Sequence, residues 1–202
     1  MASGRRVESN DANALYRLVQ KERSALNFPF SISVDGDIQL TQELDREDKD
    51  GYILVVFAED QYGNQLDPPM EIQVIVEDVN DNEPQCELEE NVFEIQEDEL
   101  VGSLVGQLLA HDADEEGTLN AQLMYSIASQ SPAPSSSAFS IDPTSGQIRT
   151  LKTLSRQEAK VYQLSVTVSD PAYSTECKVI IKVIDVNNKL PLFEKKDGRH
   201  GD

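Results

Sequence analysis

A motif rich in carboxylates and carboxamides occurs twice in this 202-residue chain, and the spacing of its copies is the strongest constraint on the fold. The first copy, at 78–84, reads DVNDNEP, and the second, at 185–191, reads DVNNKLP. The copies start at 78 and 185, a spacing of 107 residues, which is the length of one domain. We therefore interpret the chain as two tandem units, residues 1–84 and 85–191, followed by a tail or the start of a further segment at 192–202.

The segments that precede the two copies also match each other and alternate apolar and polar residues. YILVVFAED at 52–60 parallels YQLSVTVSD at 162–170. A period of two predicts half-buried β-strands, and no capped amphipathic stretch exceeds two helical turns. The strands predicted for the second unit lie near 91–96, 104–110, 121–128, 138–141, 147–151, 161–169 and 177–184. Seven short strands in about 100 residues predict an all-β fold, a two-sheet sandwich.

The first unit is shorter than the second. It reaches its final proline after 84 residues, whereas the second unit takes 107. We therefore expect the first unit to lack one or two N-terminal strands, which would leave a sheet edge uncovered.

Charge and composition exclude several classes of function. The 37 acidic residues outnumber the 17 basic ones, and the formal charge of −20 disfavours nucleic acid and anionic membrane surfaces as partners. No apolar run approaches the length of a membrane span, and the first residues lack the apolar core of a signal peptide. Two cysteines, Cys86 and Cys177, could form one bridge or remain as two buried thiols.

The order of the motifs resembles the extracellular repeats of the cadherin superfamily. The second unit carries in turn AHDADEEGTLNAQLMYSI, FSIDPTSGQIRTL, VYQLSVTVSD and VIDVNNKLPLF, and the first carries FSISVDGDIQLTQELDRED, VVFAEDQYG and VIVEDVNDNEPQ. The match covers most of residues 10–194 and is most similar to middle repeats of the subfamily with seven extracellular domains. The resemblance implies tandem Greek-key, immunoglobulin-like β-sandwiches, the first of them N-terminally truncated.

The resemblance also implies calcium, a hard cation that takes six to eight oxygen ligands. Family members draw these ligands from the end of one repeat, the linker and the start of the next repeat. Carried over by position, the ligands implied here are Asp45, Glu47, Asp78, the Val79 carbonyl, Asn80, Asp81, the Asn82 carbonyl, Asp112, Asp114, the Asn120 carbonyl and Asp170. Asp112, Asp114, Asn80 and Asp170 are expected to form the most complete site. The family's first-strand glutamate has no counterpart in the first unit, where Glu8 would serve only if the chain entered the repeat differently.

The second linker departs from the family pattern. Ser155, Gln157 and Asn188 stand where acids are expected, and Lys189 adds a positive charge, although Glu97 and Asp185 remain. We expect no calcium at this second linker.

The acidic motifs have two other interpretations, an EF-hand and a glycosidase site. An EF-hand in DREDKDG fails on spacing, because a sixth-position Gly51 would put Arg46 first and Phe57 twelfth. A glycosidase could use the pair Asp112 and Asp114, but the chain has no Trp for a saccharide cleft and no motif of a nucleophilic or zinc enzyme. We therefore expect no enzyme.

The resemblance implies calcium-dependent, homophilic cell–cell adhesion by a single-pass membrane glycoprotein at the extracellular face of the plasma membrane. The expected partners are other cadherin ectodomains, in trans or lateral contacts, with no nucleic acid and no direct membrane contact of this segment. The alternative is a non-adhesive spacer module in a receptor or a transport-associated membrane protein.

Overall fold

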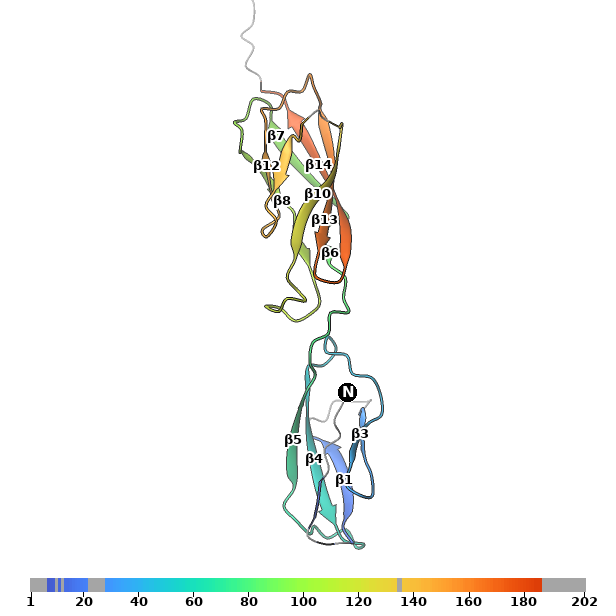
Figure 1. Ribbon diagram of the computed structural model, residues 1–202. Coiled ribbons are helices and arrows are strands. Elements are labelled where there is room, and N and C mark those ends of the chain that lie inside the picture. Colours follow the sequence, from blue (N-terminus) through green and yellow to red (C-terminus); the bar gives the residue numbers. More distant parts are fainter. Residues whose placement is uncertain (1–6, 10, 12, 22–27, 134–135, 187–202) are drawn as a thin grey trace, which may run out of the picture. The chain divides into compact units, whose positions relative to one another are not determined.

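The computed structural model describes residues 7–9, 11, 13–21, 28–133 and 136–186, and it divides the chain into two units, residues 1–79 and 80–202. Within the described residues all regular secondary structure is β-strand, which confirms the predicted fold class. Because no helix occurs among them, none of these residues forms a helix that could cross a membrane. Figure 1 shows the strands of both units.

The first unit holds two small antiparallel sheets. One has the order β1-β4-β5, and the other pairs β2 with β3. The bounds are β1 Leu15–Gln20, β2 Phe30–Ile32, β3 Ile38–Leu40, β4 Gly51–Glu59 and β5 Met70–Ile75. In β4 every second side chain is buried, namely Tyr52, Leu54, Val56 and Ala58. Phe30 of β2 meets Tyr52 edge to face at 5.1 Å between ring centroids, so the core joins the two sheets.

The second unit holds a sandwich with a four-stranded sheet, β10-β13-β14-β7, and a three-stranded sheet, β11-β12-β8. A short pair, β6 with β9, adds to these (Figure 1). The bounds are β6 Gln85–Cys86, β7 Glu90–Gln96, β8 Leu104–Gln107, β9 Ala110–His111, β10 Met124–Ser131, β11 Phe139–Ile141, β12 Gln147–Thr150, β13 Val161–Ser169 and β14 Ser174–Ile184. All the sheet pairings are antiparallel except that of β7 with β14, the last strand of the unit.

The core of the second unit is larger than that of the first. Tyr162, Leu164, Val166 and Val168 of β13 are each no more than 1% exposed, as their alternation predicts. Phe139 of β11 packs against Tyr162 with ring centroids 5.1 Å apart, which ties one sheet to the other.

The two units share a backbone arrangement that relates positions in one to positions in the other. In the second unit, Leu108 N–H donates to the carbonyl of Gly146, and a Cβ on Gly146, where φ is +68°, would collide with the Leu108 carbonyl. In the first unit, Val7 and Gly36, with φ +82°, make the same pair of contacts. Val7 therefore occupies the place of Leu108, after the positions of β7 and β8. The described residues of the first unit include no counterpart of these two strands.

The same equivalence gives the position of Glu8 in the repeat. Glu8 follows Val7 and so takes the place of Leu109, whereas the first-strand glutamate of the second unit is Glu97.

A disulfide joins Cys86 and Cys177, whose Cα atoms lie 5.9 Å apart. It links β6 to β14 across 91 residues of sequence, and Cys177 is part of the buried core. The question that the sequence left open is thus answered in favour of the bridge.

Replacing both Cys86 and Cys177 with Ser should lower the free energy of unfolding of the second unit by about 4 kcal/mol, because the open chain regains the entropy that the closed loop removes. Urea unfolding followed by circular dichroism would measure this change. Dithiothreitol should reproduce the loss in the wild-type protein and leave the double variant unchanged. An unaltered unfolding midpoint in the double variant would contradict the expectation.

The turn between β11 and β12 depends on one carboxylate. Asp142 Oδ1 accepts hydrogen bonds from the backbone N–H groups of Thr144 and Ser145, and from both of their hydroxyls, at 2.8–3.0 Å. These bonds, led by those from the Ser145 and Thr144 backbone, lower the pKa of Asp142 from 3.8 to about 2.

Because the folded pKa lies below the unfolded one, Asp142 stabilises the fold above pH 3.8, and this contribution disappears as the pH falls through about 2. We expect Asp142→Ala to lower the urea midpoint at neutral pH and to have less effect near pH 2. Parallel urea titrations of both proteins at the two pH values would test this expectation. A difference that did not shrink in acid would show that the carboxylate charge has no part in it.

Candidate metal-binding residues

Seven of the predicted ligands, Asp81 among them, lie in the second unit, at the ends of strands and in the segment that leads into β6. Asp170 follows β13, Asp112 and Asp114 follow β9, and Asn120 lies in the loop before β10. Asn80 and Asn82 belong to the entering segment. The packed strands restrict the movement of the turns at their ends, and so the fold fixes the positions of these side chains.

Each of the three aspartates has one oxygen engaged by the protein. Asp112 Oδ1 accepts the backbone N–H of Asp114 at 3.0 Å, and Asp114 Oδ1 accepts the side-chain amide of Asn82 at 2.8 Å. Asp170 Oδ1 accepts the backbone N–H groups of Ala172 and Tyr173 at 2.5 and 2.7 Å. These bonds fix the orientation of every carboxylate.

The second oxygen of each aspartate is buried without a hydrogen-bond donor. Asp112 Oδ2, Asp114 Oδ2 and Asp170 Oδ2 all lack a partner among the described residues, and so does Asn80 Oδ1. Asn80 uses its amide nitrogen instead, which donates to the Asn120 carbonyl at 3.4 Å. Buried acceptors without donors are costly, and each needs a compensating partner. Carboxylate and carboxamide oxygens are the kind of ligand that a hard divalent cation prefers.

The electrostatics of the cluster point the same way. Burial raises the pKa of Asp112, and the negative charges of Asp114 and Asp170 raise it further, against a backbone hydrogen bond that lowers it. Burial also acts to raise the pKa of Asp170, but the N–H groups of Tyr173 and Ala172 and the amide of Asn80 hold this pKa below its ordinary value. Burial and like charges thus disfavour the ionised form of Asp112, whereas hydrogen bonds favour the ionised form of Asp170.

The predicted ligands of the first unit surround an arginine. Arg46 donates from Nε to Asp78 Oδ1 and from Nη2 to Glu47 Oε1, both at 2.7 Å, and the Asp78 side chain is only 7% exposed. Asp45 Oδ1 accepts the backbone N–H groups of Glu47 and Asp48 at 2.9 and 3.2 Å. The sequence analysis did not assign Arg46 a role, although its position between two acids in LDRE indicated one.

The remaining predicted ligands are Val79 and Asp81, both exposed. Asp81 Oδ1 accepts the side-chain amide of Asn82 at 3.0 Å. At the second linker, Asn188 and Lys189 lie outside the described residues. The two acids that remain there both contact Arg156: its backbone N–H donates to Glu97 Oε2 at 3.1 Å, and its Nη1 lies 3.7 Å from Asp185 Oδ2.

The first unit repeats the aspartate arrangement, which the sequence analysis missed. Asp11 Oδ1 accepts the Asn13 N–H at 2.9 Å, as Asp112 does for Asp114. Asp60 Oδ1 accepts the N–H groups of Tyr62 and Asn64 at 2.8 Å, in the manner of Asp170. The signal in the sequence was DAN at 11–13 against DAD at 112–114.

The chain is similar in sequence and in fold to proteins of one known family. Residues 91–184 match the family model of the cadherin domain. Human Cadherin-17 is 46% identical over 193 residues, which are 95% of this chain and 23% of that protein. Mouse Cadherin-16 is 36% identical over 172 residues, 82% of this chain and 21% of that protein. The chain thus spans less than a quarter of the length of these relatives.

Solved structures agree with the sequence relatives. The crystal structure of the human Desmocollin-1 ectodomain matches with a TM-score of 0.78 and 29% identity, over 89% of this chain and 35% of that one. The crystal structure of mouse Cadherin-23 EC22-24 matches with a TM-score of 0.73 and 33% identity, over 89% of this chain and 55% of that one.

Substituting one clustered carboxylate should affect stability in opposite directions with and without calcium. Asp112→Asn removes a negative charge that repels Asp114 and Asp170, so we expect the melting temperature in EDTA to rise by about 3 °C. In excess calcium the same variant should melt below the wild type, because the substitution weakens a predicted ligand. Differential scanning calorimetry under both conditions would measure the shifts.

The matched control is Asp98→Asn, which exchanges the same groups at an exposed position of the same unit, where φ is +67° and Asn is well tolerated. It should change neither melting temperature. A lower melting temperature for Asp112→Asn in EDTA would show that the Asp112 charge stabilises the metal-free fold. That result would contradict the expected repulsion among the three aspartates.

Proposed function

Because the chain belongs to the cadherin superfamily, we propose that it is part of the ectodomain of a calcium-dependent, homophilic cell–cell adhesion protein. Calcium binding and a membrane-anchored parent are typical of this family, whose members act in adhesion and not as enzymes. The observation that carries the proposal is the set of four buried oxygens without donors, on Asn80, Asp112, Asp114 and Asp170.

The residues fit the proposed cation in kind and supply part of its six to eight oxygen ligands. Three carboxylates and one carboxamide oxygen supply both the charge and the ligand atoms, and the Asn120 carbonyl lies beside Asn80. Bound calcium would replace the missing donors and offset the repulsion among the aspartates. The chain's own part is to hold one oxygen of each aspartate by hydrogen bonds, so that the other is presented in a fixed direction.

Asp45, Glu47, Asp78, Val79, Asp81 and Asn82 remain predicted ligands on the strength of their motif positions. Arg46 is a competitor for two of them, because it already neutralises Glu47 and Asp78. We infer that these carboxylates release Arg46 when they bind a metal ion, and that calcium affinity there is lower than at the three aspartates of the second unit.

In this proposal the chain contributes to an adhesive ectodomain on the extracellular face of the plasma membrane, and its partners are ectodomains of the same family. Calcium binding by residues at a linker would limit movement between successive repeats and so present distant adhesive surfaces in a stiff array. The chain's role would then be mechanical support, with adhesive contacts made here or elsewhere on the ectodomain.

The first test is isothermal titration of calcium into the 202-residue chain, with Asp170→Asn as the variant and Asp98→Asn as the control. We expect saturable binding to the wild type and the control, with at least tenfold weaker binding to Asp170→Asn, which loses a ligand charge. Calcium should also raise the melting temperature of the wild type through linkage between binding and folding. A folded wild-type protein that takes up no calcium would refute the proposal at its centre.

Adhesion itself needs a separate measurement. Beads coated with the full ectodomain that contains this chain should aggregate in calcium and disperse in EDTA. Aggregation that persisted in EDTA would refute the calcium requirement. Binding of calcium by the chain without any aggregation of the beads would favour the non-adhesive spacer.

A further inference from the structure

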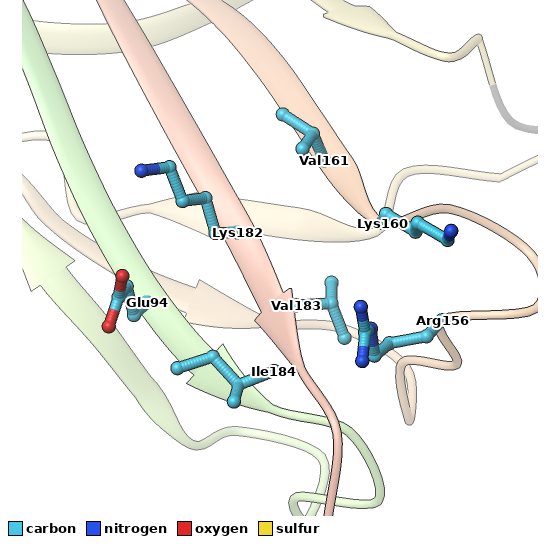
Figure 2. A pocket seen from close by; sticks show the side chains of 7 residues that line it. All are labelled: Glu94, Arg156, Lys160, Val161, Lys182, Val183 and Ile184. Atoms are coloured by element: carbon cyan, nitrogen blue, oxygen red, sulfur yellow. The ribbon is translucent and has the colours of Figure 1, made fainter.

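The second unit carries a cationic pocket of about 300 Å³ at the start of β13 and the end of β14. Figure 2 shows the side chains that line it: Arg156 and Lys160 before β13, Val161 in β13, Lys182, Val183 and Ile184 in β14, and Glu94 in β7. Three cationic side chains and one acidic one thus line the pocket, in a chain whose formal charge is −20. Such a local reversal of charge needs an explanation.

The positive charges of the pocket are largely uncompensated. No described residue forms an ion pair with Lys160 or Lys182, both of which are exposed. Arg156 reaches Asp185 only at 3.7 Å, and its buried Nε has no acceptor among the described residues. The guanidinium therefore has donors in excess of its acceptors, and an anion would satisfy them.

The first unit provides an internal reference for this place in the fold. Val76 N–H donates to the Asp50 carbonyl at 2.9 Å, and Val183 N–H donates to the Lys160 carbonyl at the same distance. The registers Gly51 with Ile75 and Val161 with Lys182 agree with this equivalence.

At the equivalent positions the side chains of the second unit are more positive. Lys160 replaces Asp50, and Lys182 replaces Ile75. Gln157 replaces Glu47. The preceding arginine is present in both units, as Arg46 in the first and Arg156 in the second. Arg46 has acceptors at 2.7 Å on two sides, whereas Arg156 keeps Asp185, the counterpart of Asp78, at 3.7 Å. In the second unit, Lys160 and Lys182 line the same pocket as the arginine.

We propose that this pocket binds a carboxylate side chain from an acidic segment of a partner polypeptide. A planar guanidinium matches a carboxylate, and the two lysines add charge beside it. Val161, Val183 and Ile184 offer apolar contact to the aliphatic stem of a glutamate, which a free inorganic anion or a densely sulfated chain would leave unused. Glu94 lines the same pocket and disfavours a doubly charged group more than a singly charged one.

The test uses fluorescein-labelled hexaglutamate as the acidic probe and the 202-residue chain at fixed free calcium. We expect saturable binding by fluorescence anisotropy that weakens as sodium chloride is raised, because exposed charges are screened. The double variant Lys160→Glu, Lys182→Glu should bind at least tenfold more weakly. Both lysines are exposed, so the variant should keep the circular dichroism spectrum and the calcium titration of the wild type.

The matched control is Lys178→Gln, on the same strand β14 but outside the pocket, where Lys178 pairs with Glu90 at 2.7 Å. It should bind hexaglutamate within twofold of the wild type. Absence of saturable binding, or equal affinity of the wild type and the double variant, would overturn the proposal. Binding of a heparin-derived hexasaccharide in preference to hexaglutamate would also overturn it, and would assign the pocket to sulfated glycans. None of these results depends on whether the aspartate cluster binds calcium.

Discussion

Mutual repulsion among buried carboxylates is the constraint on which the N-terminal end of the second unit depends. Asp112, Asp114 and Asp170 each have one oxygen tied to the protein and one buried without a donor. A fold that only had to be stable would neutralise such groups or expose them to water. Since the hydrogen bonds instead hold them in place, the cation uptake that we propose would stabilise the folded state of this end.

The sandwich below supplies the rigidity that such a cluster needs. Asp170 sits in the turn after β13, whose buried face forms the centre of the core, and Cys177 fixes the following strand to β6. Any movement of the turn would therefore displace well-packed strands. The packing of the core, in which Leu164, Val166 and Val168 are almost fully buried, offsets the unfavourable free energy of bringing these carboxylates together.

The fold was largely predictable from the sequence because alternation reports directly on burial. Residues 161–169 were predicted as a strand and form β13 with the same bounds. The two-residue strands β6 and β9 could not be predicted, because two residues have no period. The disulfide was also beyond the sequence, since two cysteines are compatible with a bridge or with thiols until their Cα distance is known.

The second aspartate arrangement escaped notice for a different reason. Seventeen positions separate Leu108 from Tyr125 (125 − 108), but only nine separate Val7 from Tyr16 (16 − 7), so the loop that carries the acids is shorter in the first unit. A repeat search at fixed spacing loses register across such a loop. The glycine contacts restore it, because Gly36 and Gly146 meet the same backbone and tyrosine neighbours in three dimensions.

The two units share backbone contacts but differ in the charge of the side chains at equivalent positions. The hydrogen bond from Val76 to Asp50 recurs from Val183 to Lys160, so the backbone is indifferent to the charge of the side chain at that position. Burial fixes the apolar residues of both units, but exposed positions at a strand start are under no such constraint. Acids there suit a cation and lysines suit an anion. If each end binds as proposed, the charge at the end of a repeat follows its ligand: Arg46 is held at 2.7 Å by two acids, whereas Arg156 keeps one acid at 3.7 Å and a buried Nε without an acceptor among the described residues.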